Sequence, residues 1–278
     1  MHFLVYLTTY NINMGATNYI SINKETWNNK VPVHIDSDFY DMKSFINGRN
    51  TLPDIDLVLL ENIKGKKILH LQCHFGQDSL SLARLGAKVT GIDLSEKAIE
   101  KARQLNDQLQ LDATFICCDI YETLEHIKEK FDIVYTSYGT IGWLPNLDKW
   151  AKVVSGALKP NGKFVFVEFH PVLWMFDDNF TKIKYHYHNE QPIIEEYTGT
   201  YANKEAEIKT NYIGWNHSLA EVFQSLSNNG LQIEHFNEYD YSNYNCFNET
   251  LEFESGKFRI KHLENKIPMM YSIKCSKK

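Results

Sequence analysis

Two acidic residues follow neighbouring apolar segments of the chain, and their positions suit the binding of a nucleoside. Asp93 directly follows the segment 87–92, and Asp119 closely follows the segment 113–117. An acid at the end of one strand can accept hydrogen bonds from both hydroxyls of a ribose, and an acid at the next can accept one from the amine of adenine. Together they predict a nucleoside lying across the strand ends, although either acid alone could simply cap a turn or helix.

The segments around these acids alternate between strand and helix patterns. Short apolar runs predict strands at 68–71, 87–92, 113–117, 131–136 and 163–169. Periodic apolar positions predict helices at 78–85, at 95–109 with Ser95 as its cap, and at 147–158. This alternation indicates βαβ units and a parallel sheet that is covered on both faces. Ligands of such sheets bind beyond the carboxyl ends of the strands, so the residues that follow each strand are candidates for a site.

Residues before the regular pattern are mixed in composition. We expect short helices and loops over 15–65, among them a helix at 54–63 that Gly65 ends. Trp27 and Tyr40 are candidates for a lid over the site, although aromatic residues more often belong to a core. We therefore expect residues 1–65 to form an N-terminal extension and helical cap, and residues 66–278 to form the catalytic domain.

A second interruption follows the strand at 163–169. Residues 170–216 are rich in Tyr, His, Ile and Glu. They predict a lid-like insertion, formed by a strand pair or a lid, with a strand at 193–201. After the insertion, residues 218–221 have the pattern of a capping box at the start of a helix. Further strands are predicted at 231–239 and 267–274.

Charge and cysteine content exclude several functions. The 278 residues include 29 Lys and Arg against 35 Asp and Glu, a net charge of −6, and no basic run is present, which argues against RNA or DNA as a partner. Five cysteines without a C-x-x-C spacing argue against a disulfide framework or a metal site and favour the cytoplasm. The apolar segment from Met1 to Asn13 is too short to span a membrane, and we expect Met14 as an alternative natural start.

The motif series resembles a known family. The stretch KKILHLQCHFGQDSLSLARLGAKVTGIDLSEKAIEKAR, followed by CCDIYE, FDIVYTSYGTIGWL and LKPNGKFVFVEFHP, is similar to the core of class I S-adenosylmethionine-dependent methyltransferases. Residues 66–169 carry the resemblance, and a bacterial subgroup shares LQCHFGQDSL in its first motif. The resemblance implies a doubly wound, Rossmann-like α/β sheet of seven strands, mostly parallel with the last strand antiparallel. It also implies S-adenosyl-L-methionine as cofactor.

The first motif departs from the usual pattern of that family, which has an acid on the strand and three glycines in the loop. His70, Gln72 and His74 stand at the first three of these positions, and only Gly76 matches. A loop without these glycines is unsuited to the close approach of a dinucleotide's pyrophosphate. The methionine part of S-adenosylmethionine has no pyrophosphate and tolerates side chains better.

The resemblance also implies roles for individual residues. Asp93 would bind the ribose hydroxyls, and Leu94 would pack on the adenine. Asp119 and Ile120 would contact the adenine edge. The remaining expected contacts are those to the methionine part and the sulfonium, from Gln72, Gly76, Ser137, Tyr138 and Gly139.

Methyl transfer needs a base only if the acceptor must lose a proton. Candidate bases are His170, just past the strand at 163–169, and His217, at the start of the helix after the insertion, with Tyr138 and Glu168 behind them. The alternative for His170 is an ordinary loop residue, and that for His217 is a local bond at a helix start. The adjacent pair Cys73 and His74 is a poor nucleophile–base pair because neighbouring residues that leave a strand tend to point apart.

These observations predict a methyltransferase that acts on a small molecule. Trp143, Trp174 and Trp215 are candidates for the wall of an acceptor pocket. Two alternatives stay open: a binding protein of the same fold that has lost catalysis, and a nicotinamide-dependent oxidoreductase. The second requires a glycine-rich first turn, which Gln72 and His74 do not provide.

Overall fold

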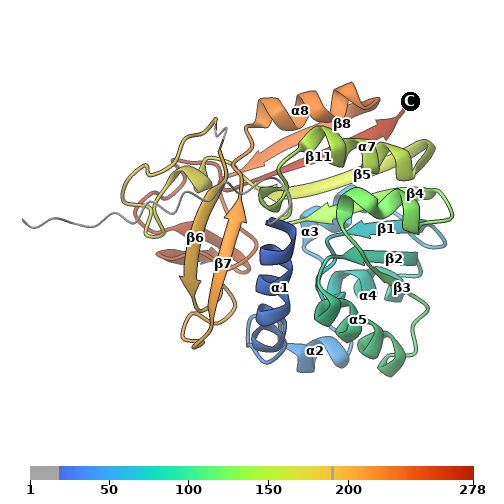
Figure 1. Ribbon diagram of the computed structural model, residues 1–278, viewed down its shortest axis with the longest axis horizontal. Coiled ribbons are helices and arrows are strands. Elements are labelled where there is room, and N and C mark those ends of the chain that lie inside the picture. The colour runs from blue at the N-terminus through green and yellow to red at the C-terminus, as the bar shows by residue number, and fades with distance from the viewer. Residues whose placement is uncertain (1–18, 189–190) are drawn as a thin grey trace, which may run out of the picture.

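The computed structural model describes residues 19–188 and 191–278, and a seven-stranded sheet forms its centre (Figure 1). The strand order is β3-β2-β1-β4-β5-β11-β8. The strands are β1 (Lys67–Leu71), β2 (Lys88–Asp93), β3 (Thr114–Cys117), β4 (Phe131–Ser137), β5 (Leu158–Phe169), β8 (Leu231–Tyr239) and β11 (Met270–Lys277). The first five strands pair in parallel, and β11 pairs antiparallel with both β5 and β8. The predicted fold class is therefore confirmed.

Helices cover both faces of this sheet because its strands are apolar on both sides. Along β1, Leu69 packs with the cluster under α7 (Leu147–Ala157) and α8 (Leu219–Asn228), whereas Ile68 packs with the cluster under α3 (Asp54–Leu60) and α4 (Gln77–Arg84). Each side chain in these clusters is withdrawn from water, which is the main term that stabilises such a layered domain.

Caps fix the starts of the helices that the sequence predicted. Ser95 Oγ accepts a hydrogen bond from Ala98 N at 3.1 Å at the start of α5 (Glu96–Gln108). Ser218 Oγ accepts one from Glu221 N at 3.2 Å at the start of α8. The second half of the expected capping box differs, because the Glu221 carboxylate lies 3.0 Å from His217 Nδ1. The predicted turn after α7 is the start of β5, where Asn161 takes a φ of 61°.

The N-terminal region is more helical than expected. In place of short helices and loops, α1 (Tyr19–Ile35) runs for 17 residues, and α2 (Met42–Ile46) follows it. The prediction failed because the buried side of α1 is largely polar, so no apolar stripe marks it. Its buried residues are Asn23, Thr26, Lys30, Val31 and His34. The helix predicted at 54–63 ends at Leu60, since Glu61 takes a φ of 57°.

Two strand pairs stand apart from the central sheet. The predicted insertion contains β6 (Ile193–Thr198) and β7 (Lys209–Gly214), which pair antiparallel, and β7 lies against α1 (Figure 1). Asn23 Nδ2 donates a hydrogen bond to Ile213 O at 2.8 Å and thereby joins α1 to β7. The second pair, β9 (Thr250–Glu254) and β10 (Lys257–Ile260), lies between β8 and β11 in the chain and was not predicted.

Two predictions about the N-terminal part of the chain are not tested by the structure. Met1 and Met14, the two candidate starts, lie outside the described residues. The proposed division at residue 65 stays a prediction. Within 19–188 and 191–278, the structure has no helix long and apolar enough to cross a membrane.

Candidate functional site

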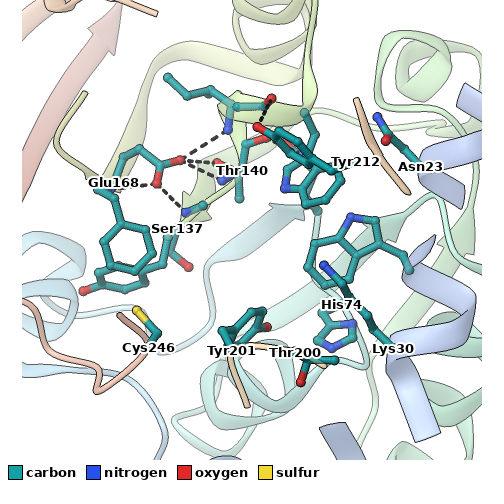
Figure 2. A pocket seen from close by; sticks show the side chains of 18 of the residues that line it. Asn23, Lys30, His74, Ser137, Thr140, Glu168, Thr200, Tyr201, Tyr212 and Cys246 are labelled. Atoms are coloured by element: carbon teal, nitrogen blue, oxygen red, sulfur yellow. Dashed lines mark hydrogen bonds between the residues drawn. The ribbon is translucent and has the colours of Figure 1, made fainter. Parts of the chain in front are cut away.

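A cavity of about 690 Å³ opens at the carboxyl ends of the parallel strands, in the size range of small-molecule sites. Its walls come from the loops after β1 to β5, from α1 and from the insertion, as Figure 2 shows for part of the lining. All nine residues predicted to contact a cofactor lie in this lining: Gln72, Gly76, Asp93, Leu94, Asp119, Ile120, Ser137, Tyr138 and Gly139. Strand topology explains their convergence, because parallel strands end at one edge of a sheet.

The loop after β1 keeps a glycine-like backbone without the glycines. Gln72 has a φ of 55° and His74 has a φ of 51°, in the left-handed region that glycine occupies most easily. Gly76 has a φ of 80°, and a Cβ there would lie 2.8 Å from the ring of Phe115. Gln72 Nε2 donates to Thr140 O at 2.8 Å, whereas its Oε1 is buried without a partner among the described residues. The loop therefore contains a buried acceptor that the described residues leave unused.

Asp93 is held rigidly at the end of β2. Its Oδ2 accepts a hydrogen bond from His74 N at 2.8 Å, and its Oδ1 accepts one from Ser95 N at 2.9 Å. Burial raises the pKa of Asp93 to about 6, while these backbone hydrogen bonds lower it. The backbone of Leu94 also bonds this carboxylate. The two oxygens carry four lone pairs in all, so acceptor capacity remains for a ligand hydroxyl.

Asp119 combines a structural role with a place in the lining. Its Oδ1 accepts a hydrogen bond from Tyr121 N at 2.9 Å and caps the short helix η1 (Ile120–Glu122). The simple capping role considered for this residue is therefore present. Asp119 also lines the cavity beside Leu94 and Ile120, whose apolar side chains suit the faces of a flat base.

Glu168, considered as a base, anchors the loop after β4. Its carboxylate accepts hydrogen bonds from the backbone N–H groups of Gly139, Thr140 at 2.7 Å and Ile141 at 3.2 Å (Figure 2). Thr140 Oγ1 donates a further bond at 3.0 Å. Burial raises the pKa of Glu168, and the backbone donors oppose that rise. With its oxygens occupied in this way, Glu168 positions the loop.

Tyr138 lines the cavity, but its hydroxyl points to a buried carboxylate. The hydroxyl donates to Asp56 Oδ2 at 2.6 Å and accepts from Asn243 Nδ2 at 3.0 Å, while Tyr135 donates to Asp56 Oδ1 at 2.6 Å. Burial raises the pKa of Tyr138 well above its usual range, and it raises the pKa of Asp56 to about 7. Tyr138 is therefore a neutral phenol near pH 7, which does not suit it to act as a base.

Neither predicted histidine offers a free ring nitrogen to the cavity. His170 lies outside the lining, with Nε2 at 2.9 Å from Glu238 Oε1 and Nδ1 accepting from Val172 N at 3.2 Å. His217 belongs to the lining, but its Nε2 lies 2.8 Å from Leu144 O and its Nδ1 contacts the Glu221 carboxylate. A catalytic role for either histidine stays a prediction that this geometry does not favour.

The contribution of α1 to the site was missed except for Trp27. Lys30 lines the cavity from this helix, and His34 Nδ1 lies 2.9 Å from His74 Nε2 in the loop after β1. Trp27 contacts both His74 and Trp143 through its indole, with ring centres 5.2 and 5.0 Å apart. The sequence did contain a signal for this helix, because Trp27, Lys30 and His34 recur at helical spacing. The face that they form is polar and aromatic, however, whereas a face that packs in a core is usually aliphatic.

The fold is that of S-adenosylmethionine-dependent methyltransferases. The chain is similar to a structure described as a putative enzyme of that class from Listeria monocytogenes, at 21% identity and a TM-score of 0.54, covering 80% of this chain and 95% of that one. It is also similar to magnesium protoporphyrin IX methyltransferase from Synechocystis with bound SAH, at 15% identity and a TM-score of 0.53, covering 94% and 100% of the two chains. At these identities the likeness establishes the fold.

Sequence comparison finds similarity to methyltransferases over the first half of the sheet. Residues 68–162 match the family model described as "Methyltransferase domain". The chain is 36% identical over 104 residues to ubiquinone biosynthesis O-methyltransferase of Coxiella burnetii, which is 37% of this chain and 44% of that protein. It is 33% identical over 133 residues to an uncharacterized methyltransferase of Synechocystis, 47% and 60% of the two chains. The match thus spans less than half of the first relative and centres on the predicted motifs.

Proposed function

We propose that this protein transfers the methyl group of S-adenosylmethionine to a small molecule. The observation that carries the proposal is the convergence of all nine predicted cofactor residues on one cavity at the strand ends. The match of residues 68–162 to a methyltransferase domain supports it. The net charge of −6 favours a small acceptor over a nucleic acid.

The residues present fit the cofactor. Asp93, fixed by two backbone donors, holds the ribose hydroxyls, and Asp119 accepts from the adenine amine. Leu94 and Ile120 pack on the faces and edge of the base. The buried Gln72 Oε1, which has no partner among the described residues, is available to the ammonium of the methionine part.

The cofactor supplies an activated methyl group on a positive sulfonium. The chain's task is to align an acceptor atom opposite that methyl group and to exclude water. The end of β4 supplies Ser137 near the sulfonium, and the loop after β4, which Glu168 holds through backbone bonds, supplies Gly139. Because the candidate bases have their polar atoms engaged elsewhere, we propose that positioning is the chain's main contribution and that the acceptor loses its proton to solvent.

Two measurements test the proposal. Calorimetric titration with S-adenosylhomocysteine should show one site per chain, and a screen of small molecules should find an acceptor that releases S-adenosylhomocysteine from S-adenosylmethionine. Failure to bind S-adenosylhomocysteine would contradict the proposal. Quenching or enhancement of reduced nicotinamide fluorescence on titration would favour an oxidoreductase instead.

A second candidate function is cofactor binding without transfer. It is favoured by the left-handed, non-glycine residues Gln72 and His74, whose backbone conformation costs stability. Tight binding of S-adenosylhomocysteine together with no turnover of any acceptor would support this candidate.

A further inference from the structure

Lys30 is a buried cation that has no anionic partner in the described residues. It lies in the middle of α1, is 9% exposed and belongs to the lining of the cavity. Its ammonium lies 4.9 Å from the ring centre of Trp27 and 5.2 Å from that of Trp143. Figure 2 shows Lys30 beside His74, across the cavity from Glu168. Within residues 19–188 and 191–278 no ion pair or hydrogen bond of its ammonium is recorded.

The surroundings of this ammonium do not neutralise it. His34 and His74 are the titratable groups that interact with it, and burial lowers their pKa values to about 2 and about 3, so both rings are neutral at pH 7. Burial lowers the pKa of Lys30 itself to about 8, which still leaves most of it protonated at pH 7. The two indole faces attract the ammonium but do not replace an anion. A buried charge in this state is costly unless a ligand pairs with it.

The position of Lys30 favours the acceptor over the cofactor as the source of that anion. Trp143, which contacts the ammonium, belongs to η2 (Ile141–Trp143) after β4, and its ring packs 4.8 Å from that of Tyr212 in β7. Lys30 therefore faces the wall that the insertion and the loop after β4 share. A second cation, Arg49, also lines the cavity. Unlike Lys30, it has partners in the chain: its Nε lies 3.7 Å from Asp41 Oδ2, and its Nη2 donates to Tyr40 O at 2.8 Å.

We propose that Lys30 binds a negatively charged group of the methyl acceptor, which is an aromatic or otherwise apolar molecule with a carboxylate or phosphate. The proposal rests on the proposed methyltransferase function. The apolar body of such an acceptor packs between the aromatic walls, and its anion pairs with the ammonium where water is excluded. Specificity follows, because a neutral analogue would leave the buried ammonium unpaired.

Lys30→Met tests the proposal, since methionine keeps most of the side-chain volume and removes the charge. Lys24→Met is the matched control: Lys24 lies on the same helix, pairs with Glu96 and is outside the cavity lining. Calorimetry measures the affinity of each variant for S-adenosylhomocysteine and for 5′-methylthioadenosine, which lacks the amino-acid part. Benzoate, phenylphosphate and the neutral benzamide are then titrated into the protein with and without S-adenosylhomocysteine.

We expect Lys30→Met to raise the dissociation constant of whichever anion binds the wild type more tightly by about tenfold or more. The dissociation constant of S-adenosylhomocysteine should stay within about threefold of the wild-type value. Lys24→Met should change neither dissociation constant. The comparison of benzoate with phenylphosphate shows whether the site prefers a carboxylate or a phosphate. The proposal is overturned if Lys30→Met weakens S-adenosylhomocysteine but not 5′-methylthioadenosine, because Lys30 then holds the cofactor's carboxylate. It is also overturned if neither anion binds more tightly than benzamide in a Lys30-dependent way. A wild-type protein that binds no S-adenosylhomocysteine contradicts the proposed function instead, and the anion titrations without it still decide the role of Lys30.

Discussion

Glu168, at the end of β5, holds Thr140, in the loop that follows the neighbouring parallel strand β4, through two hydrogen bonds, from Thr140 N at 2.7 Å and from Thr140 Oγ1 at 3.0 Å. The same carboxylate accepts from the N–H groups of Gly139 and Ile141. One buried side chain thus satisfies three consecutive backbone N–H groups of a loop that lines the cavity. The shape of the site after β4 depends on a residue of β5.

Glu168→Gln should disturb this loop, because an amide presents its NH₂ group to backbone donors that need an acceptor. We expect a loss of about 1–3 kcal/mol in the free energy of unfolding, measured by urea denaturation. Binding of S-adenosylhomocysteine should weaken at the same time, since Gly139 lies in the affected loop and Ser137 directly precedes it. Thr140→Val removes only the hydroxyl donor and should have a smaller effect on both measurements. Equal effects of the two variants would show that the backbone bonds contribute little.

Asp93→Ala should weaken binding of S-adenosylhomocysteine at least about tenfold, because hydrogen bonds to a charged acceptor are worth about 1.5–3 kcal/mol each. Asp93→Asn keeps one acceptor oxygen and should fall between this variant and the wild type in calorimetry. Both variants also remove support from His74 N and Ser95 N, so thermal unfolding must show that they are folded. An unchanged dissociation constant in a folded Asp93→Ala protein would remove this residue from the site.

Replacing both Gln72 and His74 with glycine should not improve cofactor binding. Glycine relieves a left-handed conformation that costs roughly 1–2 kcal/mol per residue, but it removes the bond from Gln72 to Thr140 O and the contact between the rings of His74 and His34. Calorimetry with S-adenosylhomocysteine measures the outcome. Clearly tighter binding would favour the alternative of a protein that has lost catalysis. Gly76→Ala is the control for the loop and should destabilise the fold, since its Cβ would meet the ring of Phe115.

Asp56 should make the stability of the protein depend on pH. Burial raises its pKa in the folded protein to about 7, whereas the carboxyl of an unfolded chain titrates near 4. The unfolded chain therefore releases this proton first, and the stabilising contribution falls as pH rises from about 4 through about 7. Relative to Asp56→Asn, the wild type should lose up to a few kcal/mol of unfolding free energy over this range and change little above it. Parallel pH profiles of the two proteins would contradict this.

The central sheet could be predicted because its strands are buried on both faces and read as continuous apolar runs. The run at 163–169 is an example, and it forms the regular part of β5. The positions of Asp93 and Asp119 followed from the same topology, since parallel strands bring their carboxyl ends together. Such apolar runs can be recognised in the sequence because a sheet that is covered on both faces buries nearly every residue of its strands.

Other parts of the molecule leave no such pattern. The buried side of α1 carries polar residues, so no apolar stripe marks the helix in the sequence. Asn23 and Thr26 donate hydrogen bonds to backbone carbonyls of β7, and His34 contacts His74. In β9, Leu251 and Phe253 are exposed, so its apolar residues do not mark a buried face. The bonds of Glu168 to residues 139–141 and of His217 to Leu144 O join segments far apart in the chain, which spacing along the sequence does not encode.

The order of the strands has a consequence for synthesis of the chain. β11 separates β5 from β8 in the sheet, so β5 keeps an unpaired edge until residues 270–277 have been made. Residues 170–269 are added in between, and at typical rates of translation this takes roughly 5–20 s. During that interval an apolar strand containing Phe164 and Phe166 is open to pairing with other nascent chains. We therefore expect misassembly during synthesis to involve the free edge of β5, which only the pairing of β11 closes.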